Sequence, residues 1–209
     1  MNFKILILAL CVFVCAGANA QQNLTRCETN RTAPPIGRYF WAPDSEVNVF
    51  FQRGEFTLEQ VAALRAAMDF WSQSGASNGS GVTFKFAGEI NEPMTCTTCL
   101  SVSRQNIRRQ FPKYLAYFLP VSVLADGQLF KAWIVLDERT TRPDVLQTFM
   151  AHELGHGLGL WDCPKCKKKA TLMKSFWSVN KVGQIMEPSL CDVEVVRGVY
   201  QQRRLVAGK

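Results

Sequence analysis

The chain has 209 residues, of which 47% are hydrophobic and 20% are charged. This length and composition suit one domain with a sizeable core, and the absence of repeats or low-complexity segments excludes a repetitive or intrinsically disordered protein. Its 24 lysines and arginines exceed its 17 acidic residues, for a net charge of +7. Because no nucleic-acid-binding motif accompanies this charge, we expect a solvated basic surface and no nucleic-acid partner.

Residues 1–20 have the pattern of a secretory signal peptide. Lys4 gives a positive start, an apolar stretch runs from Ile5 to Cys15, and small residues end the segment before Gln21. The apolar stretch is too short for a stable transmembrane anchor, although an uncleaved anchor is the alternative. We therefore expect a monomer that is secreted, or periplasmic in a Gram-negative host, with no stable membrane anchor.

Removal of residues 1–20 leaves six cysteines, an even number that indicates disulfides in an oxidising compartment. Six cysteines allow fifteen pairings. We favour two local loops and one long-range link: Cys96–Cys99, Cys163–Cys166 and Cys27–Cys191. The alternative is a structural zinc site made from the two CxxC pairs, but their separation far exceeds the usual zinc-ribbon spacing.

The first half of the chain predicts a loose lead-in, a strand and a helix. Residues 21–45 are polar and contain a Pro-Pro pair, whereas apolar residues alternate over 46–52 as in a strand. Thr57 and Gln60 have the spacing of a capping box, which starts a helix. Its apolar stripe is predicted to face the core: Leu58, Val61, Leu64, Met68 and Trp71.

The middle of the chain predicts several strands. A Gly- and Ser-rich turn or loop over 74–81 precedes a strand over 82–86. Residues 114–124 are apolar and contain Pro120, which indicates one bulged strand or two short ones. Asp126-Gly127 is a hairpin signal before a strand over 129–136. This order of strands and helices indicates an α+β fold.

Both histidines lie in the eleven-residue run HELGHGLGLWD, from His152 to Asp162. On a helix, a spacing of four places both imidazoles on one face, where they can share a metal ion. Glu153 points about 100° away, beside the metal, where a carboxylate can act as a general base. Flanking apolar residues at helical spacing place this run on a buried helix that starts near Pro143. The alternative is a chance HExxH with two solvated histidines.

A third ligand is needed, because catalytic zinc takes three protein ligands and one water. No histidine remains to supply it. Gly159 can adopt a positive φ just past the helix and turn the chain back toward the metal. Asp162, three residues later, is therefore the expected third ligand.

This run resembles the metzincin signature HExxHxxGxx(H/D), and its aspartate form is most similar to snapalysin-type and matrixin-like small secreted metalloproteases. The resemblance implies that His152, His156 and Asp162 bind one catalytic zinc ion and that Glu153 is catalytic. It also implies a zincin-like (metzincin) α+β domain over 46–209, with a twisted mixed sheet of about five strands and two long helices. The upper lobe would cover about 46–159, and the lower lobe, about 160–209, would end in a helix over 192–202.

Two further features follow from this resemblance. Metzincins have a methionine turn under the zinc, for which Met173 is preferred and Met186 is the alternative. They also bind the substrate backbone along an edge strand, for which 129–136 is the candidate, with an interior position as an equal alternative. Cys27 resembles the thiol switch of matrixins, although we favour a disulfide for it.

The predicted function is that of a secreted zinc metalloendopeptidase acting on a peptide or protein substrate. Glu153 would take a proton from the zinc-bound water that attacks the peptide carbonyl, then pass it to the leaving amine. The first alternative is a secreted zinc-binding domain of this fold without turnover. The second is a metallohydrolase acting on another kind of bond.

Overall fold

The computed structural model describes residues 27, 33–92, 95, 96, 98–112, 114–167, 170–174 and 186–207. The predicted signal peptide over 1–20 and the first part of the lead-in lie outside the described residues, so these predictions stay untested. Within the described ranges, no helix combines the length and the hydrophobicity needed to cross a bilayer.

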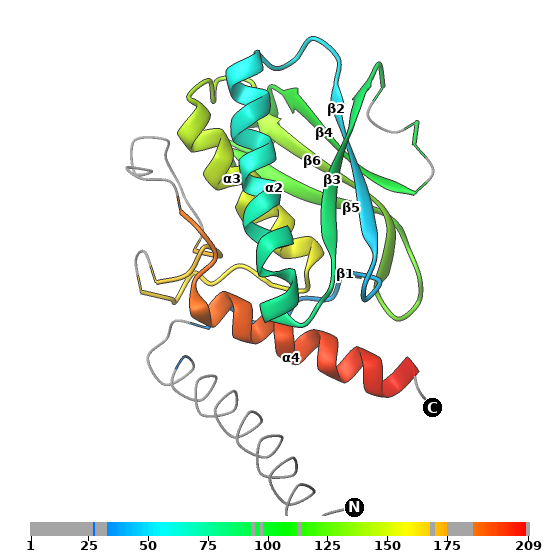
Figure 1. Cartoon of the computed structure of the whole chain (residues 1–209). Helices are drawn as coiled ribbons and strands as arrows, with labels where there is room; N and C mark the ends of the chain where they lie inside the picture. Colours follow the sequence, from blue (N-terminus) through cyan, green and yellow to red (C-terminus); the bar gives the residue numbers. More distant parts are fainter. Residues whose placement is uncertain are drawn as a thin grey trace, which may run out of the picture.

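A mixed, mostly parallel sheet forms one layer of the fold (Figure 1). In the described part of the chain it has six strands: β1 (Phe40–Trp41), β2 (Glu46–Gln52), β3 (Thr83–Ile90), β4 (Cys99–Gln105), β5 (Ala116–Val123) and β6 (Gln128–Asp137). All neighbours pair in parallel except β5, which runs antiparallel to β6. The prediction of about five strands is one short, because β1 lies within the lead-in, where no strand was expected.

Long helices cover one face of this sheet. They are α2 (Leu58–Asn78) and α3 (Pro143–Gly157), which lie side by side, while α4 (Leu190–Ala207) crosses near their C-terminal ends (Figure 1). A short 3₁₀ helix, η1 (Ile107–Arg109), follows β4. The core between α2, α3 and the sheet contains Trp71, Leu64, Phe51 and Met150, all fully buried. The predicted α+β class is therefore confirmed.

The capping box at the start of α2 is confirmed. The Gln60 backbone N–H donates to Thr57 Oγ1 (3.3 Å), and the Thr57 N–H donates to Gln60 Oε1 (3.1 Å). The loop predicted over 74–81 is wrong for its first residues, because the helix continues to Asn78 and ends at Gly79 with φ of 69°. Leu58 is also no core residue: it is 91% exposed, because it lies roughly 120° around the helix from buried Leu64.

Of the two equal alternatives for 129–136, an edge strand and an interior strand, the structure has the interior one. The strand proposed to bind substrate, 129–136, is β6, which pairs with β4 on one side and β5 on the other. It is an interior strand, and β5 is the outer one. The 114–124 segment forms this single strand, with register shifts around Pro120 and Ser122. Proline lacks an N–H donor, so it is best tolerated in such an outer strand.

The three disulfides have the favoured pairing: Cys27–Cys191, Cys96–Cys99 and Cys163–Cys166. A zinc site shared by the two CxxC pairs is thereby excluded. Because Cys27 is bonded to Cys191, it is not available as a thiol switch. The long-range link spans 164 residues and joins the lead-in to the first turn of α4.

The described part of the lead-in pairs with other segments of the fold, which the sequence did not predict. Ile36 forms an antiparallel bridge with Leu160, and β1 pairs with the first residues of β6. The segment therefore runs beside the loop that follows α3. Local sequence patterns do not reveal these pairings, because Leu160 lies 124 residues after Ile36 and Gln128 lies 88 residues after Phe40.

Candidate metal centre

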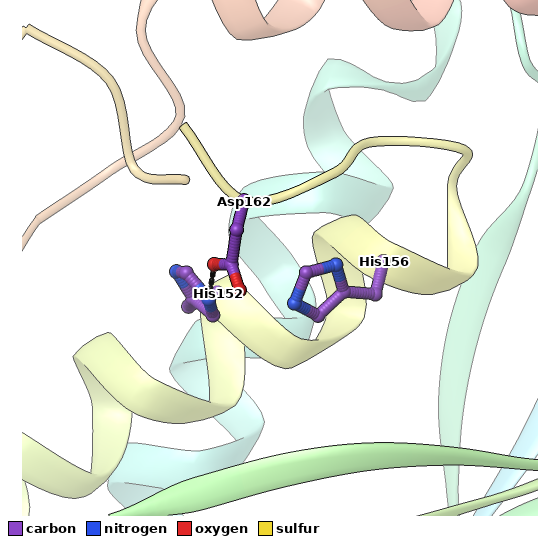
Figure 2. A group of neighbouring side chains, drawn as sticks. All are labelled: His152, His156 and Asp162. Atoms are coloured by element: carbon purple, nitrogen blue, oxygen red, sulfur yellow. Dashed lines mark ion pairs between the residues drawn. The ribbon is translucent and has the colours of Figure 1, made fainter. Parts of the chain in front are cut away.

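The C-terminal half of α3 carries both histidines, as predicted. Their rings lie 5.0 Å apart between centres and are nearly perpendicular. Only 7% of His152 is exposed, and the His156 side chain is 16% exposed. Two imidazoles are thus held close together at the edge of the core (Figure 2).

Each imidazole is oriented by a backbone carbonyl. His152 Nδ1 lies 2.8 Å from the Leu172 oxygen, and His156 Nδ1 lies 3.0 Å from the Leu160 oxygen. Because a carbonyl oxygen only accepts, each Nδ1 must carry the proton and donate it. The lone pair of a neutral ring then lies on Nε2, which is the arrangement typical of metal-binding histidines.

The chain reverses after α3 and brings Asp162 back over the helix (Figure 2). Gly159 has φ of +88°, as predicted for the turn, and an added Cβ would lie 2.9 Å from a Val199 methyl. Asp162 Oδ1 lies 3.2 Å from His152 Nε2. The ligand atoms of His152, His156 and Asp162 all lie within 4.8 Å of one another.

This donor set fits a zinc ion. Two imidazole nitrogens and one carboxylate oxygen are ligand types that zinc prefers, and three protein ligands leave one position for water or substrate. Within the described residues, these are the three residues that form such a group. The group is therefore able to hold a metal.

Glu153 lies beside this group but outside it. Its carboxyl is 3.9 Å from His156 Nε2, and the residue is 4% exposed. Burial, opposed in part by the His152 charge, raises the pKa of Glu153 from 4.5 to about 7. The negative charge of Asp162 raises this pKa further, and a hydrogen bond from the Phe118 backbone lowers it. A carboxyl with a pKa near neutrality suits a group that both takes and gives a proton.

The two histidines have opposite pKa shifts when no metal is bound. Burial tends to lower the pKa of His152, but its hydrogen bond to Asp162 and the charges of Glu153 and Asp162 outweigh burial and raise it to about 9. Burial and the charge of His152 lower the pKa of His156 to about 4. Without metal, His152 therefore binds a proton more readily than His156 does, beside the Asp162 carboxylate.

A cleft of about 570 Å³ opens onto this group. One wall is formed by residues 114–120, which include most of the first half of β5. Arg38 from the lead-in and Trp161 from the loop after α3 also line the cleft. The lining is largely aromatic: Tyr39, Tyr114, Tyr117, Phe118, Phe149 and Trp161.

A turn over 171–174 lies against α3, and it contains Met173 rather than Met186. Met173 is fully buried, and its sulfur would lie 2.6 Å from a Cβ added to Gly155, so the motif glycine makes room for it. The Leu172 carbonyl in the same turn orients His152. These contacts favour Met173 as the methionine under the site.

The sequence reading missed the residue that anchors this turn. The last helix was predicted to start at Asp192, but α4 begins at Leu190, and the buried Asp192 carboxylate faces the turn. It accepts hydrogen bonds from the Thr171 hydroxyl and the Leu172 N–H, the latter at 2.9 Å. It also accepts from the Ser189 N–H, and burial raises its pKa. The sequence did not predict this role, because Asp192 lies 20 residues after Leu172.

No protein-family model and no curated protein matches this chain. Among solved structures, it is similar to the hatching enzyme zinc-protease HCE-1 of the medaka fish Oryzias latipes, with 14% identity and a TM-score of 0.47, covering 78% of this chain and 94% of that one. Archaemetzincin of Methanopyrus kandleri is 12% identical, with a TM-score of 0.48, and the match covers 81% of this chain and 99% of that one. Metalloproteinase-II of Bacteroides fragilis is 12% identical, with a TM-score of 0.46, and the match covers 84% of this chain and 60% of that one. At these identities and scores, none of the three carries its activity over to this chain.

Proposed function

We propose that this chain is a zinc-dependent endopeptidase of the metzincin type. The observation that carries the proposal is the convergence of His152, His156 and Asp162 beside a buried glutamate in a cleft bordered by an outer strand. Further support comes from the HExxHxxGxxD run, the reversal at Gly159 and the Met173 turn. The aspartate at the third position supports a snapalysin-type or matrixin-like member.

His152 and His156, through Nε2, and Asp162, through its carboxylate, would hold the metal. Zinc bound there would supply a Lewis acid that polarises a peptide carbonyl and acidifies a water molecule. The Nδ1 hydrogen bonds to Leu172 and Leu160 keep both imidazoles in the tautomer that can bind. Asp162 adds a negative charge that a third histidine would lack.

Glu153 is the proton carrier in this proposal. Its carboxylate faces the cleft within 3.9 Å of a ligand nitrogen, so it can take a proton from the attacking water and return it to the leaving amine. A hydrogen bond from the Phe118 backbone holds this buried carboxyl beside β5. The same residue therefore serves as base and then as acid.

β5 would bind the substrate backbone. It is the outer strand next to β6, and within the described residues no strand pairs with its other side. An extended peptide can add to such an edge through main-chain hydrogen bonds. Cleft residues follow this strand over several positions, which suits a segment of polypeptide rather than a small molecule, and so favours an endopeptidase.

Export from the cell belongs to the same proposal. Residues 1–20 have the pattern of a cleaved signal peptide, and three disulfides indicate an oxidising compartment. Analysis of the protein released into the medium, including its N-terminal residue, tests this part. An N-terminus at Gln21 is the expected result.

Metal analysis and substrate digestion together test the activity. We expect about one zinc per purified molecule, cleavage within a peptide library, and loss of cleavage when a chelator removes the metal. Zinc without cleavage of any peptide or protein would instead identify a binding domain without turnover. Absence of zinc would contradict the proposal altogether.

A further inference from the structure

Asp162 comes from a loop, so its position depends on what holds that loop. The next residue, Cys163, forms a disulfide with Cys166. The Cys163 N–H also donates to the Met173 carbonyl at 2.8 Å, which ties the loop to the turn under the site. The third ligand is thus directly attached to a short covalent ring.

The lead-in holds the other side of the same loop. The Gly37 N–H donates to the Gly159 carbonyl (2.7 Å), and the Trp161 N–H donates to the Pro35 carbonyl (2.9 Å). The sulfur atoms of Cys163 and Cys166 lie 3.7 and 3.4 Å from the Ala33 carbonyl oxygen. The disulfide therefore packs against Ala33 of the lead-in. The same lead-in segment hydrogen-bonds to Gly159 and Trp161, which precede Asp162 in the loop.

The chain contains a second disulfide of the same CxxC type away from this site. Cys96–Cys99 lies at the start of β4, and Cys99 pairs with Lys131 of β6. β4 and β5 flank opposite sides of β6, so this disulfide lies across the sheet from the strand that borders the cleft. It closes a ring of equal length and contacts no ligand, which makes it a matched control.

We propose that the Cys163–Cys166 disulfide is a positioning element for the third metal ligand, an inference that rests on the zinc centre proposed above. With the ring closed, Asp162 is fixed within reach of both histidines. With the ring open, the loop samples more conformations and the metal gains less from Asp162, although α3 keeps both histidines in place. Loss of an outer support of a ligand typically weakens metal binding by about tenfold to a hundredfold.

Two double variants test this proposal: Cys163→Ser/Cys166→Ser and Cys96→Ser/Cys99→Ser. The readout is the zinc dissociation constant, measured by competition with a chelating dye, and the Tm of the metal-free protein checks the fold. We expect the first pair to weaken zinc binding by about tenfold or more. The second pair should change it by less than about twofold, because distant sites act independently. Equal effects of both pairs would overturn the proposal.

A coupling measurement separates positioning from general destabilisation. In an Asp162→Asn background, opening the Cys163–Cys166 ring should cost little further zinc affinity, because the ligand it positions is already lost. An undiminished loss there contradicts the proposal. If the double variant does not fold, Gly37→Ala disturbs the same loop with both cysteines intact, since its methyl would lie 2.8 Å from the Leu160 oxygen. Unchanged zinc affinity in that variant would also contradict it. Normal zinc binding without cleavage would refute only the peptidase.

A separate observation concerns the charge of the cleft. Apart from the three ligands and Glu153, Arg38 is the charged residue that lines it, and this residue is exposed. Its guanidinium lies 6.0 Å from the centre of the Tyr39 ring, and among the described residues it has no ion pair. Guanidinium groups bind carboxylates in a bidentate geometry.

We infer that Arg38 binds a carboxylate of the substrate, either an acidic side chain or a free C-terminus. If the chain is a peptidase as proposed, kcat/KM should be at least about tenfold higher for a peptide with that carboxylate, the effect of one charge-assisted hydrogen bond. Fluorogenic peptides with Glu, Gln or Lys at scanned positions, each with a free or amidated C-terminus, separate the two sources. Arg38→Glu should reverse the preference toward Lys, whereas Arg139→Glu, at an exposed position outside the cleft, should not.

Equal cleavage of all these peptides by the unaltered protein would overturn the role of Arg38 and leave the peptidase intact. Cleavage of none of them, or of any other peptide, would refute the peptidase instead. A preference for Glu that survives Arg38→Glu would assign the recognition to another group.

Discussion

The metal centre has two halves that are held by different kinds of contact. The helix half, His152, Glu153 and His156, lies on α3, where helical spacing fixes the side chains relative to one another. The loop half, residues 159–163 with Asp162, is held by segments from distant parts of the chain. The comparison teaches that the helix half is intrinsically ordered, whereas the loop half depends on tertiary contacts and should be the adjustable part of the site.

Loss of a helix ligand should have the largest effect. We expect His156→Ala to weaken zinc binding by more than about a hundredfold, beyond what loss of an outer support costs, because only one imidazole and one carboxylate remain. Activity should disappear with the metal. Zinc content after dialysis, with and without added zinc, is the measurement. A variant that keeps one tightly bound zinc would show that the ion is held elsewhere.

Removal of the proton carrier should lower activity without loss of metal. Glu153→Gln keeps the shape of the side chain but cannot take a proton, so kcat should fall by about 10²–10⁴. Zinc content should stay near that of the unaltered protein. Glu138→Gln, exposed at the end of β6, is the control and should keep full activity. Comparable cleavage by Glu153→Gln would refute its assigned role.

Loss of the loop ligand should have a smaller effect on metal binding than loss of a helix ligand. In Asp162→Asn, two imidazoles still hold the ion. Zinc binding should therefore weaken less than in His156→Ala, but at least as much as on opening the Cys163–Cys166 ring, by about tenfold or more. Competition titration against the same dye as for His156→Ala gives the ratio of the two effects. If Asp162→Asn loses zinc as completely as His156→Ala, the two halves contribute equally to metal binding. That result would contradict the smaller contribution expected of the loop half.

The pH dependence of zinc affinity should show that Asp162, in the loop half, raises the pKa of His152, in the helix half. Without metal, His152 has a pKa of about 9, so zinc must displace a proton below that pH. Affinity should rise by about tenfold per pH unit between pH 7 and 9 for one released proton. Asp162→Asn removes a main cause of the raised pKa and should flatten this slope. A slope unchanged by the substitution would contradict the linkage.

The stability of the metal-free protein should change with pH in the opposite sense. Since the folded state raises the pKa of His152 above its ordinary 6.5, the stabilisation is complete below about pH 6.5 and is lost as the pH rises through about 9. Urea unfolding of metal-free protein across this range measures the effect. An increase in stability from pH 7 to 9 would show that His152 is not protonated in the fold.

The smallest effect concerns the support of the helix half. Trp71 donates a buried hydrogen bond to the Ala151 carbonyl at 2.8 Å, next to His152. Trp71→Phe should reduce the free energy of unfolding by about 1–3 kcal/mol and leave zinc affinity nearly unchanged, because α3 keeps its spacing. Trp161→Phe, at a half-exposed position of the loop, should cost less than about 0.5 kcal/mol. Urea titration of both variants measures the two losses, and a larger loss in Trp161→Phe than in Trp71→Phe would contradict this prediction.

Features that depend on neighbouring residues could be predicted from the sequence. The strand over 46–52 matches β2, and the capping box at Thr57 starts α2, because both signals are local. The two histidines, Glu153, Gly159 and Asp162 could be picked out for the same reason, because they form one pattern within eleven consecutive residues. That these residues bind zinc and hydrolyse peptides stays a prediction.

Features that depend on distant partners could not be predicted. The sequence marks 129–136 as a strand but does not say which strands flank it, so an edge and an interior position stayed equal alternatives. The structure has β6 inside the sheet and β5 at its edge. The bridge between Ile36 and Leu160 and the hold of Asp192 on the 171–174 turn join segments with no common pattern. Both of these contacts support the metal centre from outside the motif.

If the chain is the peptidase proposed above, the bond between Cys27 and Cys191 has a consequence for cleavage of one copy by another. It closes almost the whole described chain into a covalent ring, so a single cut made by a second copy opens the ring without releasing either fragment. Both pieces stay joined at the first turn of α4, next to the residues that anchor the turn beneath His152. Molecules cut once between these two cysteines should therefore run as one species on a non-reducing gel and separate only after reduction.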